Sequence, residues 1–189
     1  MNLVLPSGLK CILGDIAYNQ DDYNIEITKD VFSGIKSSEL VIIDTPPGFS
    51  KLNEKLLEIA DAVIIVVTPD SISVHDGLKT ARFCERHKTH VLGVIVNRHR
   101  QGAELSKEDI EKIMLKPVLA VIPEDKAVLE AQKQGHPVIH YDFEANSTAC
   151  FKELAAKLLG EKYVEIEEQK EASKFGKLLQ KIGLWRNPH

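Results

Sequence analysis

The sequence lacks the features that mark several protein classes. Its three cysteines, Cys11, Cys84 and Cys150, are far apart and form no CxxC pair, which is typical of reduced thiols in a cytosolic protein. The seven histidines show no metal-ligand spacing. No apolar run approaches the length of about 18 residues that spans a bilayer. The N-terminus has neither a basic start nor a long apolar run, so we expect no signal peptide.

An excess of positive charge is also absent. The formal net charge is −4, which argues against a protein that coats nucleic acid, so no nucleic-acid partner is expected. Hydrophobic residues make up 43% of the 189 residues. A chain of this length and composition can bury the core of one α/β domain and still carry a tail.

Short apolar runs alternate along the chain with amphipathic stretches. Nearly continuous, β-branched runs predict strands that are covered on both faces, and they lie at 40–44, 62–67, 91–96 and 118–122. Helical patterns lie before, between and after them, at 28–38, 51–60, 73–87, 106–115, 124–134 and 146–160. This alternation predicts an α/β fold with a doubly wound, mostly parallel sheet and helices on both faces.

Three helix starts carry capping signals. Ser106, with Asp109 three residues later, is typical of a capped start. Either Asn146 or Ser147 is expected to cap the last of these helices. The helix near residue 73 has Ser71 or Ser73 as its expected N-cap.

The end of the first long strand, LVIIDTPPG, is where we expect chemistry, because ligands of open α/β sheets bind beyond the carboxyl ends of strands. The Asp44 carboxylate suits hydrated Mg²⁺, and Thr45 adds a hydroxyl. Pro46 and Pro47 make a stiff turn before Gly48, which is free to take positive φ. Such a loop can bring a backbone N–H towards a γ-phosphate. The alternative is an ordinary aspartate between a strand and a loop.

Four sequence blocks together resemble the MinD/ParA family, with MinD-like proteins as the nearest group. VIIDTPPG resembles the Walker B and switch II segment, and ADAVIIVVTPDSISVHDGLKT follows it at family-like spacing. VLGVIVNR and VLAVIPEDKAVLEAQKQGHPVI then follow in the family's order. The blocks cover residues 40–160 almost continuously. The resemblance implies a P-loop NTPase-like fold, ATP and Mg²⁺ as ligands, and ATP hydrolysis as the activity.

The resemblance also implies roles for residues of the switch and partner regions. Asp44 resembles the acid that binds Mg²⁺ through water, and Gly48 resembles the switch II glycine that faces the γ-phosphate. Residues 71–76 resemble the family region near dimer and partner contacts. A homodimer and a regulatory protein partner are therefore expected for the intact family.

A second group of residues resembles the family's adenine site. Asn97 matches the asparagine that hydrogen-bonds adenine, and its side-chain amide has the donor and acceptor that adenine N7 and N6 need. Arg98 would flank the base, and the loop of Pro123, Glu124 and Asp125 would close over it. The alternatives are that Asn97 merely ends a strand and that the loop is only a helix start favoured by the helix dipole.

The phosphate-binding loop of the family, KGGxGK[ST], has no counterpart in these 189 residues. Gly8-Leu9-Lys10 resembles this loop only superficially, because no second glycine precedes it and no Ser or Thr follows it. By resemblance Met1 falls inside the family domain, and a strand is missing between the 40–44 and 62–67 strands. We expect truncation, in preference to a split gene or a degenerate relative. The chain alone should be inactive as an ATPase and hold ATP and Mg²⁺ poorly.

The C-terminal region differs in composition from the rest. We divide the chain into a partial nucleotide-binding domain (1–160), a charged linker (161–169) and an amphipathic helix (170–186). Apolar residues share one predicted face with lysines beside it, a pattern typical of a helix in an anionic membrane interface. The predicted membrane-binding residues are Lys174, Phe175, Lys177, Leu178, Leu179, Lys181, Ile182 and Trp185. Docking on the protein's own domain or on a partner groove is the alternative.

The sequence thus predicts a MinD-like, ATP-dependent spatial regulator of division or another cellular position. It would cycle between the cytoplasm and the inner face of the cell membrane. The alternative is a catalytically inactive module that binds or dimerises at the membrane. A ParA-like DNA-partitioning protein fits less well, because nonspecific DNA binding needs a basic surface on the folded domain.

Overall fold

A computed structural model of the chain describes residues 2–4, 8–12, 40–46, 48 and 50–162. The chain divides into two compact units, residues 1–61 and residues 62–189, and each is described by itself. Within the described ranges no helix combines the length and the apolar character needed to cross a membrane. The predicted helices at 28–38 and 170–186 lie outside the described residues.

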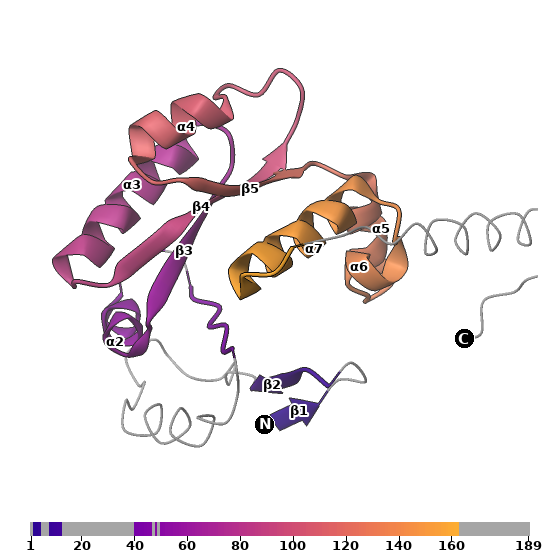
Figure 1. The fold of residues 1–189 in the computed structure, drawn as a ribbon, viewed down its shortest axis with the longest axis horizontal. Coiled ribbons are helices and arrows are strands. Elements are labelled where there is room, and N and C mark those ends of the chain that lie inside the picture. Colours follow the sequence, from indigo (N-terminus) through magenta and orange to yellow (C-terminus); the bar gives the residue numbers. More distant parts are fainter. Residues whose placement is uncertain (1, 5–7, 13–39, 47, 49, 163–189) are drawn as a thin grey trace, which may run out of the picture. The chain divides into compact units, whose positions relative to one another are not determined.

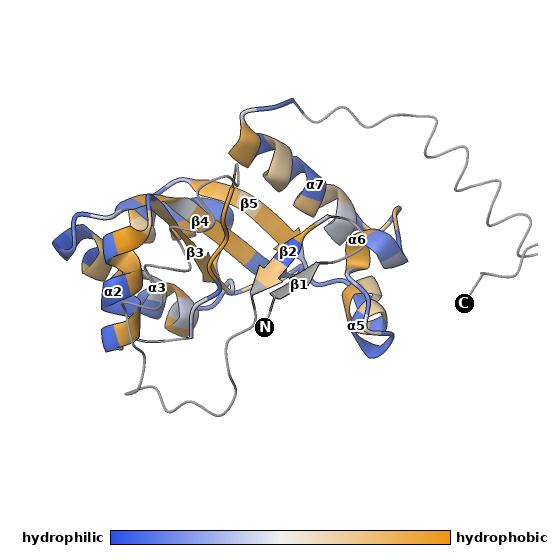
Figure 2. Ribbon diagram, turned by 90° about the horizontal axis from the view of Figure 1, so that it is seen from below, coloured by the Kyte–Doolittle hydropathy of each residue, from blue (hydrophilic) through white to orange (hydrophobic). Residues whose placement is uncertain are grey.

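The second unit is built on a parallel sheet of three strands, shown in Figure 1. Strand β3 (Ala62–Val67) pairs with β4 (His90–His99), which pairs in turn with β5 (Val118–Pro123). These are three of the predicted strands, and their parallel pairing confirms the α/β fold class. Most residues of these strands are hydrophobic (Figure 2), as expected for a sheet that helices cover.

Helices cover both faces of this sheet (Figures 1 and 2). Helices α3 (Ser71–Arg86) and α4 (Lys107–Met114) pack on one face, while α7 (Asn146–Leu159) packs against β5 on the other. Helix α5 (Lys126–Lys133) and the short helix α6 (Val138–Tyr141) lie between β5 and α7 in the chain. Helix α5 was predicted from the sequence, and α6 was not.

The core lies between the sheet and helices α3 and α4. Val94, Val96 and Ile110 have no exposed surface, and Met114 is 1% exposed. Helix α3 approaches the sheet closely because Gly77 has no side chain: a Cβ there would lie 2.7 Å from Cγ1 of Val67. Each large apolar side chain buried here contributes about 1.5–3 kcal/mol relative to exposure, so this face supplies much of the unit's stability.

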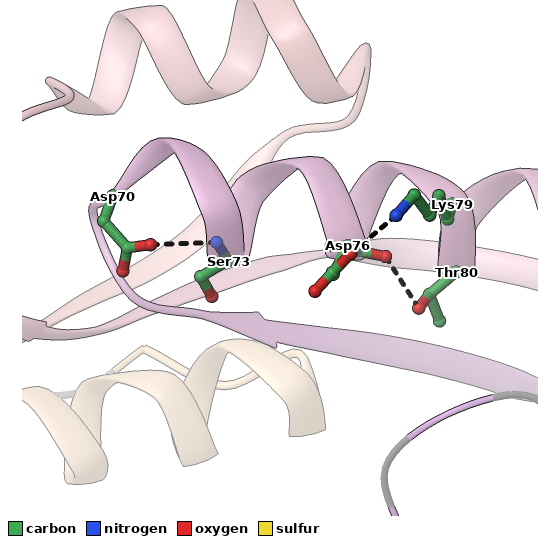
Figure 3. Close-up of polar contacts among 5 residues, drawn as sticks. All are labelled: Asp70, Ser73, Asp76, Lys79 and Thr80. Carbon is green, nitrogen blue, oxygen red and sulfur yellow. Dashed lines mark hydrogen bonds and ion pairs between the residues drawn. The ribbon is translucent and has the colours of Figure 1, made fainter.

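The start of helix α3 differs from the prediction. Neither Ser71 nor Ser73 is its N-cap. Asp70 takes that position, and its Oδ1 accepts a hydrogen bond of 2.9 Å from the backbone N of Ser73 (Figure 3). A carboxylate is a stronger acceptor for a helix N-terminus than a hydroxyl, and the Ser73 hydroxyl instead accepts from the backbone N of Thr68.

Two other helix starts were also predicted from their sequence. Helix α4 begins as expected, because Ser106 and Asp109 form a reciprocal capping box. Helix α7 does not, since its N-cap is Ala145, which has no side chain that can cap. The Ser147 hydroxyl instead donates a hydrogen bond to Asp125.

The first unit contains the short antiparallel pair β1 (Asn2–Val4) and β2 (Lys10–Ile12) and helix α2 (Lys51–Ile59). The prediction of a strand at 40–44 was wrong, because these residues belong to no strand. Leu40 and Ile42 are 58% and 82% exposed. A strand needs a hydrogen-bonded neighbour, and none of the strands in the described ranges pairs with this segment.

Candidate functional site

The carboxyl ends of β4 and β5 bring together two sets of predicted site residues. Their registers align so that His99 faces Pro123. The backbone N of Glu124 donates a hydrogen bond of 2.8 Å to the carbonyl of His99. Asn97 and Arg98 on β4 therefore lie at the same sheet edge as the turn of residues 123–125. We call this edge, formed by residues 97–99 and 123–125, the base edge, after its predicted role beside adenine.

Asn97 is partly buried near the end of β4. Its Oδ1 accepts a hydrogen bond of 3.0 Å from the backbone N of Arg98, which has a φ of 55° and an exposed side chain. The Nδ2 of Asn97 donates to none of the described residues. A carbonyl oxygen has two lone pairs, so among the described residues this side chain retains one acceptor position and both donors. That is the pattern a purine edge requires.

Asp125 is the N-cap of α5. Its Oδ1 accepts a bond of 2.9 Å from the backbone N of Ala127, and its Oδ2 accepts from the backbone N and hydroxyl of Ser147, at 3.2 and 2.9 Å. Partial burial raises the pKa of Asp125, but the bonds from Ala127 and Ser147 outweigh burial and hold that pKa below its usual value. Asp125 is therefore ionised at neutral pH and starts a helix, while its role beside adenine stays a prediction.

Ser147 is a residue of this region that we had predicted only as a helix cap. Its side chain has no exposed surface, and it joins the start of α7 to the turn before α5. The only signal in the sequence was a serine in the first turn of a helix. That signal does not identify an acceptor 22 residues away.

Residues 44–48, which were predicted as a switch II segment, belong to the first unit. Asp44 and Thr45 are exposed, and Pro47 lies outside the described residues. Gly48 has a φ of 93°, in agreement with the prediction of a positive value. Asn53 on α2 holds this turn through hydrogen bonds from Nδ2 to the carbonyls of Pro46 and Gly48, at 3.1 and 2.6 Å.

A magnesium site is not complete in the described part of the chain. No group of three or more His, Cys, Asp or Glu side chains gathers there in a way that would hold a metal. Mg²⁺ takes about six oxygen ligands, mostly waters and phosphate oxygens with one or two carboxylates. Asp44 supplies a single exposed carboxylate, so these residues do not form a Mg²⁺ site without a phosphate ligand.

Comparison with known proteins decides the family. Residues 27–159 match the ParA family profile, described as NUBPL iron-transfer P-loop NTPase. The chain belongs to the MinD/ParA family of P-loop NTPases. The fold agrees, because a chain of the MinC:MinD cell division protein complex of Aquifex aeolicus aligns with 77% of this chain, at a TM-score of 0.68 and 27% identity.

Two relatives in sequence show how much of a longer protein this chain covers. An uncharacterized ATP-binding protein of Methanocaldococcus jannaschii is 37% identical over 72% of this chain, which covers 53% of that protein. The septum site-determining protein MinD of Neisseria meningitidis is 33% identical over 77% of this chain, which covers 59% of that protein. The chain also covers 63% of the Aquifex chain, so it spans a little over half the length of these relatives.

Proposed function

We propose that this chain carries the adenine-binding edge, the switch II segment and the membrane anchor of a MinD-like spatial regulator. In this role the base edge holds the adenine of ATP. Asn97 accepts from and donates to the base, Arg98 flanks it, and Pro123 and Glu124 cover it. Asp44 and Gly48 act at the γ-phosphate end, where P-loop NTPases hold Mg²⁺ with a Walker B aspartate.

The single observation that carries this proposal is the bond from Glu124 N to His99 O. It supports a shared edge in which the Asn97 amide, whose donors bond to none of the described residues, stands beside an acidic turn. In open α/β sheets such edges, at the carboxyl ends of strands, are where ligands bind.

These 189 residues hold no KGGxGK[ST] sequence. They therefore do not supply the family's phosphate-binding loop, which we call the phosphate grip. Without the loop amides and the lysine, the β- and γ-phosphates have few partners. We therefore expect adenine recognition by this chain to be weak, and ATP turnover by the chain alone to stay at background.

Membrane cycling completes the proposed role. The helix predicted at 170–186 would combine an apolar face with lysines in a chain that is otherwise acidic, which favours reversible binding to the anionic inner face of the cell membrane. One such helix binds weakly, and two in a homodimer bind far more tightly. The similar Aquifex structure is a MinC:MinD complex, which supports a regulatory protein partner for this chain as well.

A second function is favoured by the same missing phosphate grip. A chain that binds no ATP tightly can still dimerise and hold a partner at the membrane as an inactive module. The two functions differ in their dependence on nucleotide, because the inactive module binds membrane equally well with and without ATP.

The proposed adenine role predicts that Asn97→Ala weakens binding of adenosine monophosphate by roughly tenfold. Removing the amide leaves the base donor and acceptor unpaired, which costs about 1–3 kcal/mol. The measurement is a titration of ¹⁵N-labelled chain with adenosine or guanosine monophosphate, followed by amide shifts at residues 97–99 and 123–127.

The matched control is Gln101→Ala, which removes an exposed amide just beyond β4 and should leave binding unchanged. Equal affinity of the wild-type chain for the adenosine and guanosine nucleotides would contradict the adenine role. So would an Asn97→Ala chain that binds adenosine monophosphate like the wild type.

A further inference from the structure

The first turn of α7 is capped from a distant part of the chain. Its own N-cap, Ala145, makes no side-chain capping bond, although the first N–H groups of a helix need acceptors. The backbone N of Ser147 finds its acceptor in Asp125, at 3.2 Å. Asp125 is at the same time the N-cap of α5. One carboxylate therefore serves two helix starts.

Ser147 adds a second bond to the same oxygen. Its hydroxyl donates to Oδ2 of Asp125 at 2.9 Å, and the side chain is fully buried. Capping α5 requires only Oδ1, which accepts from Ala127. The two bonds from Ser147 fix the other oxygen and so set the orientation of the whole carboxylate.

The turn before α5 is thus held from two sides. On one side, the backbone N of Glu124 bonds to the His99 carbonyl of β4. On the other, Asp125 is tied to Ser147 of α7, whose first turn lies together with α5 and α6 (Figure 1). The position of residues 123–125 relative to Asn97 therefore depends on α7 as well as on the sheet.

We infer that Ser147 is a positioning residue that sets the turn of Pro123–Asp125, and through it the base edge. The effect of Ser147 on nucleotide affinity rests on the function proposed above, whereas its effect on the position of residues 123–125 does not. Ser147 is not itself one of the base-edge residues. It acts through Asp125, whose charged oxygen makes these bonds stronger than bonds between neutral groups.

Thr148 provides a matched control for Ser147. It is also fully buried, and its hydroxyl donates to the carbonyls of Asp142 and Val138, at 2.7 and 3.3 Å. Ser147→Ala and Thr148→Val each remove one buried hydroxyl from the first turn of α7 with little change in volume. Only Ser147→Ala removes a bond to Asp125.

The test measures amide hydrogen exchange and adenosine monophosphate binding in the full chain. In Ser147→Ala we expect exchange at Ala127 and Glu124 to rise at least about fivefold over Thr148→Val, with affinity for the nucleotide falling by a similar factor. Adding Ser147→Ala to Asp125→Ala should change neither quantity further, because the two residues act as one unit.

The outcomes separate this inference from the adenine role. Equal exchange at Ala127 and Glu124 in Ser147→Ala and Thr148→Val would overturn it. A fivefold difference in exchange would support it even if the wild-type chain bound no adenosine monophosphate. In that case the adenine role alone would fail.

Discussion

Replacing Leu179 and Trp185 by glutamate will release this chain from anionic vesicles, with a loss of affinity on the order of 1000-fold or more. Burying a large apolar side chain is worth about 1.5–3 kcal/mol, and the double change removes two such groups from the predicted apolar face. Each new negative charge also meets an anionic surface, where a charge is worth about 1 kcal/mol. Co-sedimentation with phosphatidylglycerol-rich vesicles measures the effect.

Leu184→Glu is the matched control, because Leu184 falls off the predicted apolar face. It makes the same change of residue type as Leu179→Glu and should retain most of the binding. Vesicles of phosphatidylcholine alone should bind the wild-type chain weakly. If the double variant pellets with anionic vesicles as well as the wild type does, the membrane anchor is wrong and residues 170–186 dock elsewhere.

Gly93→Ala will destabilise the second unit by about 3 kcal/mol or more. An added Cβ would lie 2.5 Å from the carbonyl oxygen of Pro117 and 2.7 Å from Cγ of Leu119. That carbonyl accepts the backbone N–H of Val94 at 2.9 Å, so it cannot move away without loss of the junction between β4 and β5. Urea unfolding followed by circular dichroism gives the free energy of unfolding.

Gly135→Ala separates this steric effect from backbone strain. Gly135 has a φ of 70° and open space around its added Cβ, so alanine there costs only the left-handed conformation, about 1–2 kcal/mol. A loss of stability in Gly93→Ala no larger than in Gly135→Ala would show that β4 and β5 do not pack as closely as described.

The sequence predicted the strands of the second unit because their runs are apolar on both faces. The segment 40–44 has the same pattern, yet it forms no strand. The apolar pattern of a segment shows that it is suited to a sheet covered on both faces. It does not record whether a neighbouring strand is there to accept its hydrogen bonds, and that depends on residues far away in the chain.

Candidate site residues were predictable where a local rule applies. The family resemblance placed Asn97 and residues 123–125 at one site, and the rule that parallel strands end at one edge of a sheet agrees with that placement. The positive φ of Gly48 also follows from the residue type. The bond between Ser147 and Asp125 did not follow, because a serine in a first turn predicts a cap for its own helix and not a distant carboxylate.

The relative affinity of this chain for ATP and adenosine monophosphate tests the central claim, that the base edge is present without a phosphate grip. With Mg²⁺ present, we expect ATP to bind within about threefold of adenosine monophosphate, both with dissociation constants on the order of 1 mM. Calorimetry or the amide-shift titration measures both. Micromolar binding of ATP beside millimolar binding of the monophosphate would contradict the claim, because the chain would then grip the β- and γ-phosphates.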